Sequence, residues 1–179
     1  MFTRLMRRDP LDTNIEKLYG AIVAQARAPA FYSAYGVPDT AAGRFDMIVL
    51  HVHLVVRRLV GEGAERPTAG RELCERFFSD MDANLRELGV GDLAVPRQMR
   101  DIAEAYYGRA KSYDAALQEK GEAALAAVLA RNVFGKPEPV SAVSERLARY
   151  IHRLQTTLAA QPEDSIVRGE IAFPRPEDA

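Results

Sequence analysis

The sequence predicts an all-α fold: a single domain of about six helices with short connections and a mostly irregular C-terminal tail. Apolar residues recur every three or four positions through most of the 179 residues, which is the spacing that places them on one face of a helix. Prolines and glycines mark the breaks between these periodic stretches. A chain of this length fits one domain of ordinary size.

We expect three segments along the chain. Residues 1–9 form a basic N-terminal segment, residues 10–160 a helical domain, and residues 161–179 an acidic, proline-containing tail. The tail has no helical period, so we expect order there only where another part of the chain holds it. The N-terminal segment reads either as a solvated terminus or as a weak peripheral contact with a membrane, because apolar residues accompany its three arginines.

The first helix is predicted over 11–27, with Thr13 and Glu16 in the pattern of a capping box. Pro29 ends it, because the residue before a proline avoids helical geometry. A loop follows over 31–40, and its last two residues, Asp39 and Thr40, are both suited to cap the next helix.

The stretch from Ala42 to Val60 is rich in β-branched residues, which are typical of a strand. Its length and its lack of an internal turn favour a buried helix instead. His51 and His53 lie within it, and two residues apart on a helix they point to different sides. We therefore expect buried or half-buried, hydrogen-bonded histidines here and no metal site, with Cys74 as the single cysteine.

The third helix is predicted from Thr68 to Leu88, where the apolar period is strongest. Gly89 follows at the position that favours a left-handed residue after a helix, and Val90 is placed to pack against the last turn. Pro96 is placed to start the fourth helix, whose apolar face continues to Leu117.

The last two helices are separated from the fourth by clear breaks. Gly121 interrupts the pattern, and a shorter helix follows with apolar residues from Leu125 to Val133. The residues FGKPEP form a loop, and the sixth helix is predicted from Ser141 to Ala159.

Composition excludes several classes of protein. Twenty-four basic residues against 25 acidic ones give a net charge of −1, which argues against DNA binding and gives no support for contact with ribosomal RNA. One cysteine rules out an internal disulfide and indicates a reducing compartment. No apolar run reaches the roughly 18 residues that a membrane-spanning helix needs. We expect a cytoplasmic bacterial protein, at most peripheral at the inner membrane.

The stretch SDMDANLRELGVGDLAVPRQM raises the question of chemistry, because Asp80 and Asp82 resemble a catalytic pair. Mid-helix, however, their side chains point to different faces. Asp82 and Arg86 are spaced as an ion pair, and Asp80 is placed to pair with an arginine of another helix. We interpret Asp80, Asp82, Arg86 and Asp92 as a structural polar network that fixes the corner between two helices; the alternative is that they face a partner.

A glycine inside the fourth helix is unexpected, because glycine there costs about 1 kcal/mol relative to alanine. Gly108 indicates either a close approach of two helices or a flat place for a partner's backbone. Tyr107 and Arg109 would then be the anchors, since tyrosine and arginine often dominate binding energy at interfaces.

Two stretches together resemble the ubiquinol–cytochrome c chaperone family. They are FYSAYGVPDTAAGRFDMIVLHVHLVVRRL, over 31–59, and FFSDMDANLRELGVGDLAVPRQMRDIAEAYYGRAKSYDAAL, over 77–117. The similarity covers roughly residues 10–160. The Asp-Met-Asp, Arg-Glu-Leu-Gly-Val-Gly-Asp and Tyr-Gly-Arg elements carry it by their order, since none is specific alone.

The resemblance implies an all-α, non-enzymatic assembly factor for the cytochrome bc1 complex. Mitochondrial members bind newly made cytochrome b and work with a small partner at the ribosomal exit site. We accordingly expect cytochrome b or another bc1 subunit as partner, and no cofactor or metal. Candidate partner-binding residues are Phe31, Tyr32, Tyr35, Tyr107, Arg109 and Tyr113. The alternative is an enzyme with a helical active site around Asp46, His51 and Asp82.

Overall fold

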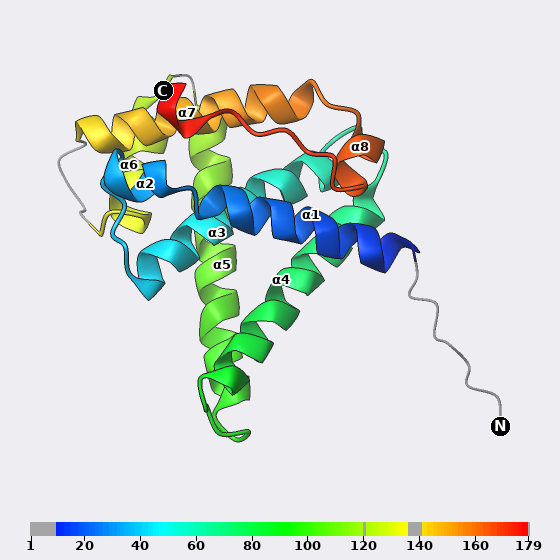
Figure 1. Ribbon diagram of the computed structural model, residues 1–179. Coiled ribbons are helices and arrows are strands. Elements are labelled where there is room, and N and C mark those ends of the chain that lie inside the picture. Colours follow the sequence, from blue (N-terminus) through cyan, green and yellow to red (C-terminus); the bar gives the residue numbers. More distant parts are fainter. Residues whose placement is uncertain (1–9, 120, 136–140, 179) are drawn as a thin grey trace.

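The computed structural model describes residues 10–119, 121–135 and 141–178, and these residues confirm the all-α fold (Figure 1). The elements are α1 (Pro10–Ala26), α2 (Pro29–Ser33), α3 (Ala41–Val60), α4 (Pro67–Glu87), α5 (Val95–Gln118), α6 (Ala123–Asn132), α7 (Ala142–Ala159), α8 (Glu163–Val167) and the 3-10 helix η1 (Pro176–Asp178). The six long helices correspond to the six predicted ones. The one-turn helices α2 and α8 lie where a loop and the tail were predicted.

Helix α3 is the centre of the domain. Twelve of its 20 residues are buried, and it packs against α1, α4, α5 and α7. The β-branched residues that suggested a strand are instead the inner surface of a helix that is covered on nearly every side. The prediction of a buried helix is therefore confirmed.

Local sequence signals explain where α3 begins. The hydroxyl of Thr40 accepts a hydrogen bond from the backbone nitrogen of Gly43 at 3.1 Å, so Thr40 is the cap. A Cβ on Gly43 would lie 2.0 Å from the carbonyl oxygen of Pro38, which only glycine avoids. The capping box predicted at Thr13 is wrong as a helix start, because α1 already includes Pro10.

The turn between α4 and α5 has the predicted geometry. Gly89 has a φ of +80°, and its backbone nitrogen donates to the carbonyl of Arg86 at 3.0 Å. The nitrogen of Val90 donates to the carbonyl of Leu85 at 3.0 Å. These two bonds form a Schellman motif, which satisfies the last carbonyls of α4 and directs the chain back along α5.

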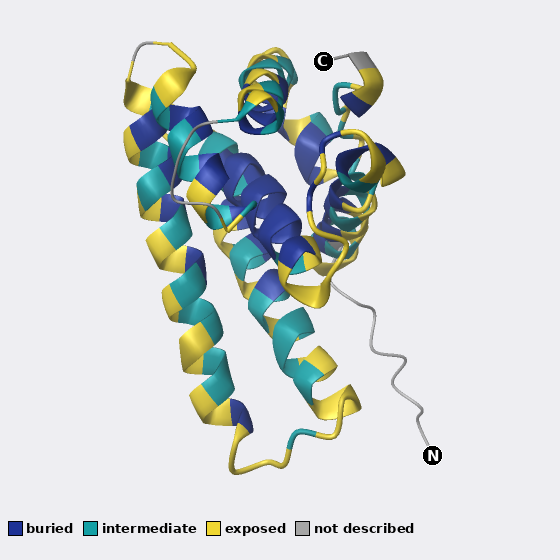
Figure 2. Cartoon of the chain, turned by 90° about the vertical axis from the view of Figure 1, so that its left-hand side faces the viewer, coloured by how far each residue is buried: buried dark blue, intermediate teal, exposed yellow. Residues whose placement is uncertain are grey.

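Helices α4 and α5 form an antiparallel pair that extends beyond the rest of the domain (Figure 1). We call residues 78–105, the outer part of this pair, the distal arm. In Figure 2 buried residues gather in the body, while the arm is mostly intermediate or exposed. Val95 is the single residue of the distal arm that is buried.

The tail packs along the body instead of remaining separate. Tyr35 donates from its hydroxyl to the carbonyl of Pro176 at 2.6 Å, and Gln25 donates to the carbonyl of Pro174 at 3.2 Å. Ile166 and Val167 of α8 are buried in the same core as α1. Residues 1–9, including the proposed membrane contact, lie outside the described residues, as does most of the predicted FGKPEP loop.

A buried carboxylate connects the tail to the α3–α4 loop. Glu163 is 5% exposed, and one of its oxygens contacts the guanidinium of Arg58. The other oxygen accepts hydrogen bonds from the backbone nitrogens of Glu65 and Arg66, both at 2.8 Å. One side chain thus satisfies a cation and two backbone donors from segments nearly 100 residues away in sequence.

We predict that Glu163→Ala lowers the free energy of unfolding by about 3 kcal/mol, because it leaves a partly buried cation and two backbone donors without a partner. The neighbouring Asp164→Ala is the control, since Asp164 pairs with Arg66 in solvent and such pairs contribute less than about 1 kcal/mol. Urea unfolding of both variants measures the difference. Equal losses would contradict the role given to Glu163.

Candidate functional site

An aromatic cluster lies where the distal arm joins the body. Its members come from three helices: Phe45 of α3, Phe77 and Phe78 of α4, and Tyr106 and Tyr107 of α5. Neighbouring rings have centroids 5.1 to 6.2 Å apart, mostly tilted or edge-to-face, which is a favourable geometry for aromatic pairs. The cluster therefore holds the base of the arm rigidly against α3.

Tyr107 is the exposed end of this cluster. Its side chain is 60% exposed, while its ring lies 6.0 Å from that of Phe78 and 5.2 Å from that of Tyr106. The neighbouring Gly108 has no atom within 4 Å of where a Cβ would be, so the expected close approach of two helices is wrong. Tyr107 and Gly108 instead lie on an open part of α5, and the binding of a partner there stays a prediction.

Arg109, the second predicted anchor, is turned inward. Its Nη2 lies 2.8 Å from Oδ1 of Asp46, and its guanidinium lies 5.9 Å from the ring centre of Phe45. Burial raises the pKa of Asp46 to about 6, and Arg109 opposes that rise. Arg109 thus compensates a buried carboxylate, and no local pattern in the sequence indicates a pair 63 positions apart.

Three of the predicted partner-binding residues are core residues. Phe31, Tyr35 and Tyr113 are fully buried, so as folded they offer no contact area to a partner. This is a correction to the sequence interpretation. Its physical reason is that large aromatic side chains suit a core as well as an interface. Tyr32 is half-buried, and its hydroxyl donates to the carbonyl of Ala26 at 3.0 Å.

The predicted polar network divides into two parts. Arg86 contacts Asp82 and Asp92, each at 2.6 Å, across the α4–α5 turn. Asp80 is separate: its carboxylate accepts from the hydroxyl of Tyr19 on α1 at 2.8 Å, where the sequence suggested an arginine. The contacts of Arg86 are largely exposed and so stabilise the turn only weakly. The role of this network as a structural lock stays a prediction.

His51 is a fully buried hydrogen-bonding residue. Its Nδ1 lies 2.8 Å from the carbonyl of Met47, and because a carbonyl only accepts, Nδ1 carries the proton. Its Nε2 then accepts from the hydroxyl of Tyr150 at 3.0 Å, and that oxygen accepts from Gln25 at 3.0 Å. Burial lowers the pKa of His51 from 6.5 to about 4, so the ring is neutral.

The residues nominated for an enzyme active site have separate surroundings. Asp46 pairs with Arg109, His51 bonds within the core, and Asp82 pairs with Arg86 on the distal arm. His53 contacts Asp114 at 3.0 Å, and burial lowers the pKa of His53. Within the described ranges, no group of three or more histidine, cysteine or carboxylate side chains is arranged to hold a metal ion.

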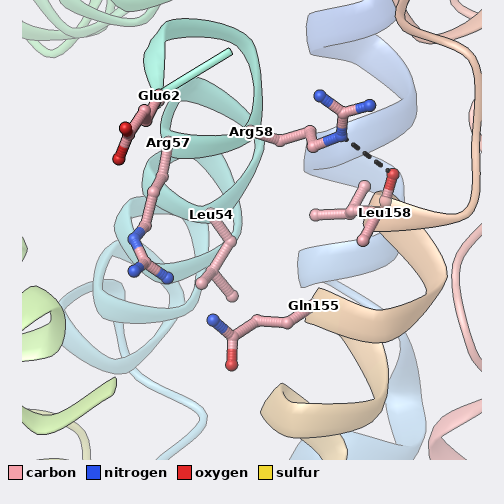
Figure 3. Close-up of a pocket in the computed structure, with 8 residues that line it drawn as sticks. Leu54, Arg57, Arg58, Glu62, Gln155 and Leu158 are labelled. Atoms are coloured by element: carbon pink, nitrogen blue, oxygen red, sulfur yellow. Dashed lines mark hydrogen bonds between the residues drawn. The ribbon is translucent and has the colours of Figure 1, made fainter. Parts of the chain in front are cut away.

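A hollow of about 410 Å³ lies between the C-terminal turns of α3 and α7 (Figure 3). Leu54 and Leu158 line it, together with Arg57, Arg58 and Gln155. Its two cations are already compensated, because Arg57 contacts Asp114 at 3.0 Å and Arg58 contacts Glu163. The hollow therefore offers no uncompensated charge to attract an anion.

The surface that sequence reasoning missed is the distal arm. Its apolar residues have the helical spacing that is typical of a core-facing side, but most remain half-exposed, and Leu88 and Leu93 are 81% and 100% exposed. Exposed large apolar side chains that gather on one part of a molecule often mark an interaction site. The feature of the sequence that could have indicated this surface is the length of the two predicted helices, because their outer ends extend beyond the helices that cover the rest.

Together, these features define an all-α protein with an open aromatic and apolar surface. No helix in the described ranges is both long and apolar enough to cross a membrane. Residues 33–173 match the family model described as ubiquinol-cytochrome C chaperone. The chain belongs to this family.

Known relatives agree with this assignment. The chain is 26% identical over 162 residues to ubiquinol-cytochrome c reductase complex assembly factor 1 of Drosophila melanogaster, covering 87% of this chain and 62% of that protein. The human protein of the same name is 23% identical, covering 88% and 52%. The chain thus spans only about half to three-fifths of these relatives. A crystal structure of the Cbp3 homolog from Brucella abortus superposes with a TM-score of 0.83 at 34% identity, covering 99% of this chain and 98% of that one.

We predict a specific pH dependence of stability from His51. Between pH 6.5 and about 4, His51 is protonated in the unfolded chain but stays neutral in the folded protein. The free energy of unfolding therefore falls as pH falls through this window. Between pH 7.5 and pH 5 this loss is about 2 kcal/mol. In His51→Phe that part of the loss disappears, because the titrating group is gone.

Urea unfolding of the wild type and of His51→Phe at both pH values measures the effect, since all other titrating groups are common to both chains. Tyr150→Phe is the control: it removes the hydrogen-bonding hydroxyl but keeps the imidazole, so it retains the pH dependence. Parallel losses in the wild type and His51→Phe would contradict the prediction.

Proposed function

We propose that the protein is a non-enzymatic chaperone that supports assembly of ubiquinol–cytochrome c reductase, the cytochrome bc1 complex. The observation that carries this proposal is the family match over residues 33–173, on a fold with an open apolar surface. The names of the Drosophila and human relatives describe assembly factors of this complex and support the same role.

Within that role, we propose cytochrome b as the client. A membrane subunit that is not yet assembled exposes apolar surface, and a chaperone that shields it needs an apolar surface of its own. The base of the arm offers such a surface at Tyr107 and Gly108. The proposal has the protein work in the cytoplasm, where it would meet its client next to the inner membrane.

A non-enzymatic role is supported by the separate surroundings of Asp46, His51 and Asp82. A catalytic site needs titratable groups that converge on one place. Here the fully buried His51 bonds to Met47 and Tyr150, and each carboxylate has its own arginine. No observation favours a second function over the assembly role.

The proposal predicts that deleting the gene removes the cytochrome b and c1 bands of the bc1 complex from reduced-minus-oxidised spectra of membranes. The wild-type gene supplied in trans should restore them, and bands of other cytochromes serve as the control. Bc1 bands that stay at full height in the deletion strain would contradict the assembly role.

A further inference from the structure

The distal arm is a pair of helices whose apolar surface lacks a third layer. On α4, Phe78, Met81 and Leu85 recur at helical spacing and are all half-buried; Phe78 and Met81, at the base of the arm, also pack against the core of the body. On α5, Met99 and Ile102 do the same. By contrast, 12 of the 20 residues of α3 are buried. A pair of helices leaves apolar residues beside their contact half-exposed, and a third helix is the element that normally covers them.

The apolar surface continues to the end of the arm. Leu88 is 81% exposed and Leu93 is 100% exposed, the highest values among the exposed large apolar side chains of the described residues. From Phe78 to Leu88 the helix rises about 15 Å, which is the length of about three helical turns. Methionine is flexible and polarizable, so Met81 and Met99 suit a surface that adapts to different partner side chains.

The arm is also acidic. Residues 78–105 contain three arginines and six carboxylates, a net charge of −3, whereas the whole chain carries −1. Arg86 is committed to Asp82 and Asp92. Glu87, Asp101 and Glu104 are exposed on the same arm. The field around the apolar surface therefore attracts positive charge and repels negative charge.

We propose that the distal arm binds a single apolar helix that has lysine or arginine residues beside its apolar stretch. The apolar residues of the arm require an apolar helix face, and the surrounding carboxylates require basic flanks. The same charge disfavours two other occupants: a second copy would bring its own −3 arm, and an anionic lipid surface would be repelled. The inference rests on the proposed function for its biological partner, since transmembrane helices carry basic residues at their cytoplasmic ends.

The test uses the full chain and two fluorescein-labelled peptides, each a Leu/Ala helix of about three to four turns. One peptide has lysines at both ends and the other has glutamates. Fluorescence anisotropy should show that the wild type binds the lysine peptide at least about tenfold more tightly, and that salt reduces the preference.

Charge variants locate the binding surface. Asp101→Lys/Glu104→Lys should abolish or reverse the preference for the lysine peptide. Glu62→Lys/Glu119→Lys makes the same change in total charge at exposed positions outside the arm and should leave the preference intact. If both double variants behave alike, the preference reflects net charge and the proposal is overturned.

Apolar variants test the exposed apolar residues of the arm. Leu88→Ser/Leu93→Ser should weaken binding of both peptides by about tenfold, because their exposed side chains have little role in the fold. The control is Val60→Ser, at an exposed apolar residue of the body, which should leave binding of both peptides unchanged. Unchanged binding in the leucine variant would overturn the proposal. Two further results would also overturn it. One is a wild-type dimer in sedimentation that the leucine variant does not form, because a second copy would then be the occupant of the arm. The other is wild-type binding to phosphatidylglycerol vesicles that the leucine variant loses, because a lipid surface would then be the occupant.

The outcomes separate this inference from the proposed function. If the deletion strain loses the bc1 bands but the protein shows no preference between the two peptides, the proposal of a helix-binding arm is overturned and the assembly role stands. Intact bc1 bands with a clear, arm-dependent peptide preference would overturn the assembly role alone.

Discussion

The structure depends on the burial of α3. Twelve of its 20 residues are buried, mostly apolar ones, and α1, α4, α5 and α7 cover them; the order of these helices around α3 defines the domain. Helices α4 and α5 are longer than this contact requires. Their inner ends cover α3 through Phe77, Tyr106 and Tyr113, while their outer ends extend past the body. The distal arm is thus a consequence of two helix lengths and one tight turn.

Polar groups inside the body connect segments that are distant in sequence. Glu163 joins the tail to the α3–α4 loop, and the chain of Gln25, Tyr150 and His51 joins α1, α7 and α3. Each group is satisfied by defined partners, which rigidifies a core and specifies one arrangement of it. The body thus supports the arm with one defined arrangement of helices, and we expect contacts with a partner at the arm.

The sequence predicted what depends on local chemistry. Helical periodicity located the six long helices, and Gly89 and Thr40 marked an end and a start, because a left-handed residue and a capping hydroxyl act within a few positions. The prediction was wrong where contacts between residues distant in sequence determine the position of a side chain. The aromatic residues expected on a surface lie in the core instead. Conversely, Leu85 and Met99 have core spacing but remain half-exposed on the outer part of the arm.

The most direct test of the account is photocrosslinking in living cells from the end of the distal arm. A photoreactive amino acid at Leu93 should crosslink to a subunit of the bc1 complex, at an apolar segment next to basic residues. The same probe at Val60, exposed on the body, should not. Crosslinks from Leu93 that join only copies of this chain, or that are as frequent from Val60, would contradict a client-binding arm.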